Sequence, residues 1–280
     1  MRRLFGLVGA NRPWMVVFAG LVVAVSCALP AAAAAGTVVV AHGRPVEIAV
    51  VLDRSTGVGA PVTPAIVNAI HMATQFIPVI RGFRVQLDPY DAPCGGDEAV
   101  APDASAAQSV VANPQTVAVV GHECSYAFSG GAVVDDNGVC QTPTTPNALA
   151  IYEAAGIPTI DGSATSPCLP ADGPTVFNRT VVDDANFDPW YAAVQTLPSD
   201  KLWTAIYTLE FGAPPTEFAD LYFDATTLLL ARTYQVSRLG EGRLVIDRAA
   251  LAQAIRHTTG FPGVTGPITL DPTTGNRATS

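Results

Sequence analysis

Short apolar runs alternate with longer amphipathic stretches along the chain from Val46 onward. The run Val46–Leu52 is apolar at almost every position, which is typical of a strand buried on both faces of a parallel sheet. The stretch Thr63–Ile80 has apolar residues at near-helical spacing and Pro64 in its first turn, so it predicts a helix. The same patterns recur as far as residue 181. They predict strands at Phe83–Leu87, Thr116–Val120, Ile157–Ile160 and Thr175–Val181, and helices at Ala99–Asn113, Ser125–Val134 and Ala148–Ala155.

Strands that alternate with helices at this spacing indicate β-α-β units. We therefore expect an α/β fold: a doubly wound, mostly parallel sheet with helices on both faces, and residues 46–181 as its core. Residues 182–259 are mainly helical in pattern, and residues 260–280 form a tail rich in Gly, Pro and Thr. This second part predicts helices at Lys201–Phe211, Ala219–Val236 and Asp247–His257, and a short strand at Ile268–Leu270. Because such sheets bind ligands at the carboxyl ends of their strands, the loops 53–60, 121–126 and 161–166 are the places to look for a site.

Residues 1–35 have the pattern of an export signal. Arg2, Arg3 and Arg12 precede a stretch without charge, Trp14–Ala35, which ends in a run of alanines. A positive region, an apolar region and small residues near a cleavage point are the three parts of a signal peptide. An uncleaved anchor and lipidation at Cys27 are the alternatives that these residues leave open. Each of them places residues 36–280 in the periplasm or elsewhere on the exterior of the cell envelope.

The charge of the chain limits its possible binding partners, and its cysteines bear on the cellular compartment. The 280 residues include 15 Lys and Arg against 24 Asp and Glu, a formal charge of −9, so we expect no binding of nucleic acid through a basic patch. Four cysteines follow Cys27, and cysteines outside the cytoplasm tend to form disulfides. They are Cys94, Cys124, Cys140 and Cys168, and their spacing alone allows three ways of forming two bridges.

Several segments, taken in order, resemble one family. They are 48–51 (IAVV) with 55–57 (STG), 90–94 (YDAPC), 119–125 (VVGHECS), 151–158 (IYEAAGIP), 163–167 (SATSP), 258–261 (TTGF) and 263–269 (GVTGPIT). This series is similar to the type I periplasmic substrate-binding proteins of ABC transporters, the leucine/isoleucine/valine-binding protein family. Members of that family close two α/β lobes over a ligand. This chain follows the first lobe to about Thr180 and continues with the helices that return to it, so we expect most of the second lobe to be missing.

The resemblance implies a function and a site. The expected function is binding of a branched-chain amino acid or a similar small zwitterion or amide, for uptake through the membrane permease of an ABC transporter. The positions that match Ser125, Ser163, Ala164 and Thr165 form the part of the family's site that holds the ligand's α-carboxylate and ammonium groups. Helix N-termini and hydroxyl groups suit a carboxylate. The resemblance also pairs Cys94 with Cys124, which leaves Cys140 to pair with Cys168.

The sequence leaves two alternatives to transport. For an enzyme, His122, Glu123 and Cys124 are adjacent reactive residues, but neighbours in a strand point to opposite faces and do not converge. No catalytic motif, cofactor or metal site is predicted; the segment 184–188 resembles a calcium loop only faintly, because Pro189 stands where such a loop needs Gly. The second alternative is an interaction or sensor protein with a single lobe and no transport function, or a truncated gene product.

Overall fold

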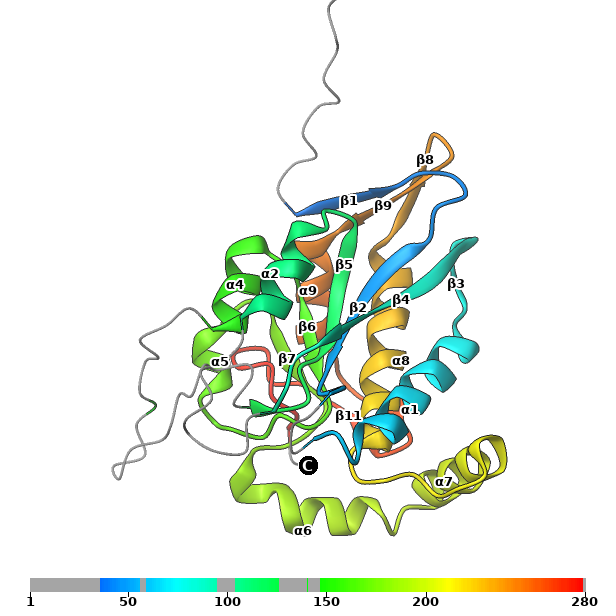
Figure 1. The fold of residues 1–280 in the computed structure, drawn as a ribbon, viewed down its shortest axis with the longest axis vertical. Helices are drawn as coiled ribbons and strands as arrows, with labels where there is room; N and C mark the ends of the chain where they lie inside the picture. Colours follow the sequence, from blue (N-terminus) through cyan, green and yellow to red (C-terminus); the bar gives the residue numbers. More distant parts are fainter. Residues whose placement is uncertain (1–35, 56–58, 95–103, 126–139, 141–146, 279–280) are drawn as a thin grey trace, which may run out of the picture. The chain divides into compact units, whose positions relative to one another are not determined.

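A six-stranded sheet forms the centre of the protein (Figure 1). The computed structural model describes residues 36–55, 59–94, 104–125, 140 and 147–278, and all of them belong to one compact unit. The strand order is β3-β4-β2-β5-β6-β7, and every pair is parallel except β3 with β4. The strands are β2 (Val46–Leu52), β3 (Val79–Ile80), β4 (Phe83–Asp91), β5 (Thr116–Gly121), β6 (Thr159–Asp161) and β7 (Phe177–Arg179).

Helices cover both faces of this sheet, as the sequence predicts. Along β2, Ile48 and Val50 belong to the core shared with α1 (Thr63–Phe76) and α8 (Ala219–Val236), whereas Ala49 and Val51 belong to the core shared with α2 (Ser105–Ala112) and α4 (Ala148–Ala155). Side chains that alternate between two apolar cores explain why β2 has no polar face. The predicted fold class is confirmed.

The remaining elements lie around the central sheet. A second, antiparallel sheet has the order β1-β9-β8, and a hairpin joins β10 to β11. Their bounds, with those of the other helices, are β1 (Thr37–Val40), β8 (Arg238–Gly240), β9 (Arg243–Asp247), β10 (Phe261–Gly263), β11 (Gly266–Ile268), α5 (Leu169–Asp172), α6 (Asp184–Val194), α7 (Pro198–Phe211) and α9 (Arg248–Arg256). Among the described residues, no helix has the length and apolar character needed to cross a membrane.

Most of the predicted elements occur, and one helix is shorter than predicted for a local reason. The helix predicted over Thr63–Ile80 ends at Phe76, and Val79–Ile80 forms a strand instead. Pro78 explains the difference, because proline disfavours helical geometry at the residue before it. The sequence also failed to predict α6 and the sheet β1-β9-β8. The helix predicted at Ser125–Val134 lies outside the described residues apart from Ser125. The division into a signal segment, a core, returning helices and a tail stays a prediction.

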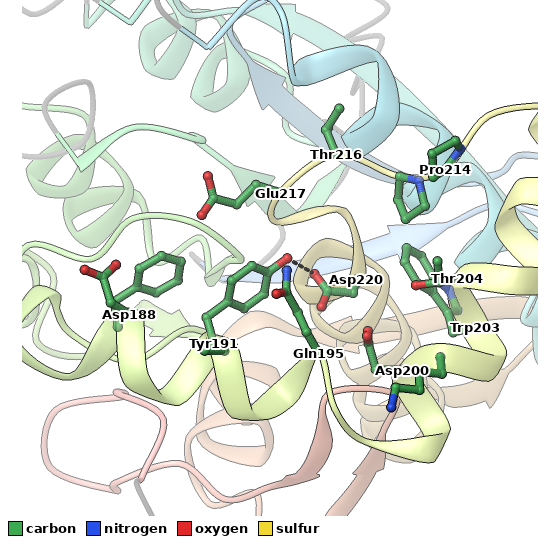
Figure 2. A pocket seen from close by; sticks show the side chains of 14 residues that line it. Asp188, Tyr191, Gln195, Asp200, Trp203, Thr204, Pro214, Thr216, Glu217 and Asp220 are labelled. Atoms are coloured by element: carbon green, nitrogen blue, oxygen red, sulfur yellow. Dashed lines mark hydrogen bonds between the residues drawn. The ribbon is translucent and has the colours of Figure 1, made fainter.

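Helices α6 and α7 meet the start of α8 at the end of the molecule toward which β2 and β5 point (Figure 1). The inner face of α7 is held by Trp203 and Tyr207, which share a core with Ala65 and Ala69 of α1 and with Phe223 of α8. Between α6, α7 and the loop before α8 lies a cavity of about 540 Å³ (Figure 2). These two helices and the loop before α8 therefore enclose a hollow.

Candidate functional site

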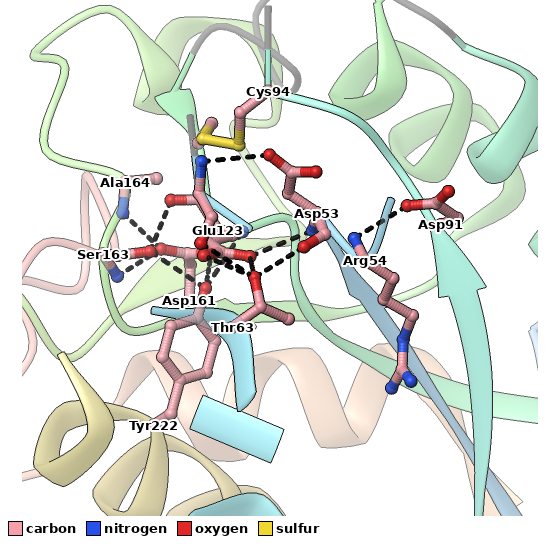
Figure 3. The surroundings of a disulfide bond; sticks show 12 residues. Asp53, Arg54, Thr63, Asp91, Cys94, Glu123, Asp161, Ser163, Ala164 and Tyr222 are labelled. Atoms are coloured by element: carbon pink, nitrogen blue, oxygen red, sulfur yellow. Dashed lines mark hydrogen bonds between the residues drawn. A yellow bond between two sulfur atoms is a disulfide. The ribbon is translucent and has the colours of Figure 1, made fainter. Parts of the chain in front are cut away.

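The carboxyl ends of β2, β5 and β6 bring a polar cluster together (Figure 3). Asp53 follows β2, Glu123 comes two residues after β5, and Asp161 is the last residue of β6. Thr63 at the start of α1 and Tyr222 of α8 approach the same point. All five are buried, so the cluster depends on its own hydrogen bonds.

Glu123 lies at the centre of this cluster. Its carboxylate accepts hydrogen bonds from the Asp53 backbone N–H at 3.0 Å and from the Thr63 hydroxyl at 2.8 Å. Its own N–H donates to the Tyr222 hydroxyl at 2.9 Å, and its carbonyl accepts from the Ser163 hydroxyl at 2.5 Å. The φ angle of Glu123 is +57°, a conformation that non-glycine residues rarely adopt. The residue therefore links the loops after all three strands.

Burial determines the electrostatics of the cluster. It raises the pKa of Glu123 to about 7, and the neighbouring Asp53 and Asp161 carboxyls add to this rise, while the bonds from Thr63 and Asp53 N–H oppose it. Burial also raises the pKa of Asp161, against the effect of N–H groups from Ser163 and Ala164. The cluster thus holds three carboxyl groups in a poorly solvated place, where a nearby positive charge would be favourable.

Ser125 and Thr165, two of the four predicted ligand-binding residues, lie half-buried after β5 and β6. The Ser125 hydroxyl accepts from the Ser166 N–H at 3.0 Å, and the Thr165 carbonyl accepts from the Asp184 N–H at 3.0 Å. No hydrogen bond joins the Thr165 hydroxyl to any residue that the structure describes. Thr165 therefore presents a polar group that an external ligand can use.

Ser163 and Ala164, the other two, are buried and have internal partners. Ser163 is 8% exposed and Ala164 is fully buried, and both of their N–H groups donate to the Asp161 carboxylate. The Ala164 carbonyl accepts from the Arg179 guanidinium at 2.8 Å. Their structural role is to hold the Thr165 loop in place; a ligand-binding role for all four residues stays a prediction.

Both predicted disulfides are present. Cys94 is bonded to Cys124 and Cys140 to Cys168, with Cα–Cα distances of 5.9 and 5.3 Å. The first joins the segment after β4 to the Glu123 loop (Figure 3), and the second attaches Cys140 to the start of α5. We expect close to zero reactive thiols when residues 36–280 are denatured without a reductant and titrated. Two or more thiols per chain would show that one bridge does not form.

The three adjacent reactive residues His122, Glu123 and Cys124 do not converge on one point. His122 is fully buried, its Nε2 lies 2.8 Å from the Tyr152 hydroxyl, and burial lowers its pKa to about 3, so the ring is neutral. Glu123 is directed to Thr63 and Asp53 instead, and Cys124 is in a disulfide. The segment 184–188 lies in α6 and not in a loop.

Sequence reasoning missed part of the site. Tyr222 was noted only as part of a returning helix, yet its hydroxyl lies 3.0 Å from both Ser163 Oγ and Asp161 Oδ2. Thr63 and Asp161 were not singled out either. No local signal marks them, because Tyr222 and Asp161 are 61 residues apart in the chain and meet only in the fold.

Comparison with solved structures identifies the fold. No family model matches the chain, and a search of curated proteins finds no match. A leucine-binding protein, LivK, from Thermotoga maritima aligns with 83% of this chain and 93% of its own, at 15% identity and a TM-score of 0.60. LivJ from Streptococcus pneumoniae, in complex with isoleucine, aligns over 81% and 92%, at 14% identity and a TM-score of 0.60. The chain has the fold of the type I periplasmic binding proteins.

The predicted resemblance to this group of proteins is thereby confirmed at the level of fold. Neighbours with the same fold differ in ligand: a solute-binding protein of an ABC transporter from Rhodopseudomonas palustris, in complex with benzoate, aligns over 83% of this chain and 91% of its own. Its identity is 14% and its TM-score 0.59. The first of these neighbours is named as a leucine-binding protein, and the other two as binding proteins of transporters.

Proposed function

We propose that this protein is an extracytoplasmic solute-binding protein of an ABC transporter that binds a branched-chain amino acid or a similar small zwitterion or amide. The observation that carries the proposal is the half-exposed edge formed by Ser125 and Thr165 after β5 and β6, on a fold whose solved neighbours bind small molecules for transport. The proposed location is the periplasm or the exterior of the cell envelope, with a membrane permease as partner.

The chemistry of this edge suits a zwitterion. The Thr165 hydroxyl and the Ser125 loop can donate to a carboxylate, as backbone and hydroxyl donors at strand-to-helix turns commonly do. The buried carboxyls of Glu123 and Asp161, directly behind the edge, favour a positively charged ammonium group. No enzymatic step is proposed for these residues.

Thr165→Ala tests this proposal. Calorimetry against a panel of amino acids and their amides is expected to show binding of at least one of them. Thr165→Ala should lower the affinity for that ligand by about tenfold, because it removes a hydrogen bond to a charged group. Thr227→Ala is the matched control, because the Thr227 hydroxyl bonds only within α8, to the Phe223 carbonyl. The proposal is contradicted if no compound of the panel binds, or if Thr165→Ala and Thr227→Ala bind the ligand equally well.

A second function, binding of another protein through α7, has one observation in its favour. Leu202, Ile206 and Leu209 form an apolar stripe at helical spacing on the outer face of α7, with 63%, 43% and 87% of their surface exposed. Contiguous exposed apolar surface is typical of interaction sites. An amino-acid panel without ligands, together with a stable complex that Ile206→Asp abolishes, would favour this function over transport.

A further inference from the structure

The cavity between α6, α7 and the start of α8 is lined by a different set of residues from the Ser125–Thr165 edge. Its volume of about 540 Å³ falls in the range of small-molecule sites. The lining combines aromatic side chains with carboxyl groups (Figure 2). The aromatic residues are Phe187, Tyr191 and Trp203, and the acidic residues are Asp188, Asp200, Glu217 and Asp220.

Two of these carboxyl groups are deeply buried and close to each other. Asp200 is 6% exposed and Asp220 is 4% exposed. Asp220 accepts from the Tyr191 hydroxyl at 3.1 Å and from the Leu221 N–H at 2.9 Å. The Asp220 carboxyl faces that of Asp200 within hydrogen-bond reach, and the Lys201 ammonium is the opposite charge that acts on Asp200. Four carboxyl groups line the cavity against this one lysine, so a bound cation would offset the negative charge there.

The arrangement of the charges defines the ligand that would offset this negative charge. Figure 2 shows Asp188 and Glu217 on one side of Tyr191, and Asp200 with Asp220 on the other. Both Asp188 and Glu217 are exposed, so the cavity has an acidic mouth and an acidic interior, separated by an aromatic wall. Lys201 is the one basic residue among those that line it. Ammonium groups bind to carboxylates and to aromatic faces, and an alkyl chain packs against aromatic rings.

We propose that this cavity binds a small aliphatic diamine, with one ammonium group held by Asp200 and Asp220 and the other near Asp188 and Glu217. The alkyl chain then lies along Tyr191. The acidic protein, with a formal charge of −9, attracts such a dication to its surface. The site is separate from the proposed amino-acid site and adds a second ligand class to the protein.

Binding should release a proton, because burial raises the pKa of Asp220 to about 8 and Asp200 lies beside it. Further groups act on this pair: Tyr191 at the cavity, Lys201 on α7, Asp224 on α8, and Arg277 from the C-terminal segment. Glu217 acts on the Tyr191 hydroxyl that binds Asp220. The cation binds the ionised form of Asp200 and Asp220, so a proton on this pair competes with the cation. The apparent affinity should therefore rise by up to about tenfold per pH unit from pH 6 to 8 and level off above that.

Calorimetry with 1,4-diaminobutane on the full chain tests the proposal. We expect binding at pH 8, a heat of binding that depends on the ionisation enthalpy of the buffer, and weaker binding of butylamine. Asp200→Asn and Asp220→Asn should each lower the affinity for the diamine by at least about tenfold, because one ammonium group loses a buried charged partner. Asp220→Asn should also flatten the pH dependence. Glu210→Gln, an exposed acid on α7 outside the cavity, is the matched control and should bind as the parent does.

The outcomes separate this site from the proposed amino-acid site. Both asparagine variants keep the size of the side chain and remove a buried charge, so we expect them to fold; their thermal unfolding confirms it. The absence of any heat with millimolar diamine at pH 8 overturns the inference. The inference is also overturned if Glu210→Gln lowers the affinity for the diamine as much as Asp200→Asn does. Thr165→Ala should leave diamine binding unchanged, and Asp200→Asn should leave amino-acid binding unchanged, so either proposal can fail alone.

Discussion

Asp224→Ala is expected to lower the free energy of unfolding by about 3–5 kcal/mol. The Asp224 carboxylate is 1% exposed and accepts hydrogen bonds from the Val264 N–H at 2.8 Å, the Thr265 N–H at 3.0 Å and the Thr265 hydroxyl at 2.5 Å. These bonds attach the β10–β11 turn to α8. The Thr265 hydroxyl in turn accepts from the buried Arg277 guanidinium at 2.7 Å. Removing the carboxylate therefore leaves three buried donors without their acceptor and removes one of the negative charges that act on Arg277.

Urea unfolding of the parent protein and of Asp224→Ala at pH 7 measures this loss of stability. Glu210→Ala is the control, because Glu210 is exposed on α7 and exposed substitutions of this kind change the free energy of unfolding by about 0.5 kcal/mol or less. A loss below about 1 kcal/mol for Asp224→Ala would mean that α8 and the C-terminal hairpin are not held together through this carboxylate.

Glu123→Gln should make the protein more stable at pH 8 and leave its stability near pH 4 almost unchanged. The pKa of Glu123 is raised from 4.5 to about 7 in the folded state, so the folded protein binds this proton more tightly than the unfolded chain does. The stabilisation from this proton is fully present below pH 4.5 and is lost as the pH rises through about 7. The loss amounts to about 3 kcal/mol. A glutamine side chain stays neutral, and its oxygen can still accept from Asp53 N–H and the Thr63 hydroxyl.

Urea unfolding of the two proteins at pH 5, 6, 7 and 8 tests this expectation. Part of the pH dependence should remain in Glu123→Gln, since the pKa of the buried Asp220 is also raised, to about 8. Glu217→Gln serves as the control because Glu217 is exposed. If Glu123→Gln and the parent protein lose stability in parallel from pH 5 to 8, Glu123 does not carry a proton in the folded state.

The central sheet was predictable because its strands have local signals. β2, α4 and α8 begin and end where the sequence predicts, at Val46–Leu52, Ala148–Ala155 and Ala219–Val236. Each is a continuous apolar or amphipathic run bounded by polar or turn-forming residues. The strands of the second sheet have no comparable local signal. β1 has four residues, and its partner β9 lies about 200 residues further along the chain. Pairing over that separation leaves no periodic trace in a short segment.

The candidate site was predictable only in part. Ser125 and Thr165 were placed correctly at the ends of strands, since the carboxyl ends of parallel strands share one edge of a sheet. The burial of Ser163 and Ala164 could not be predicted, because it depends on Asp161, which accepts both of their N–H groups, and on Tyr222. Glu123 was considered only as a neighbour of His122 and Cys124, although the structure makes it the residue that links three loops.

The sequence by itself determined the α/β class and the positions of the main strands along the chain, because alternating apolar patterns and turn residues act within a few positions of one another. It also indicated both disulfides through the family resemblance. Only the tertiary structure decided which polar groups are buried together: Glu123 with Asp161 at the sheet edge, and Asp200 with Asp220 beside α6. Their raised pKa values come from loss of solvent and from neighbours distant in the chain, and a linear pattern contains neither.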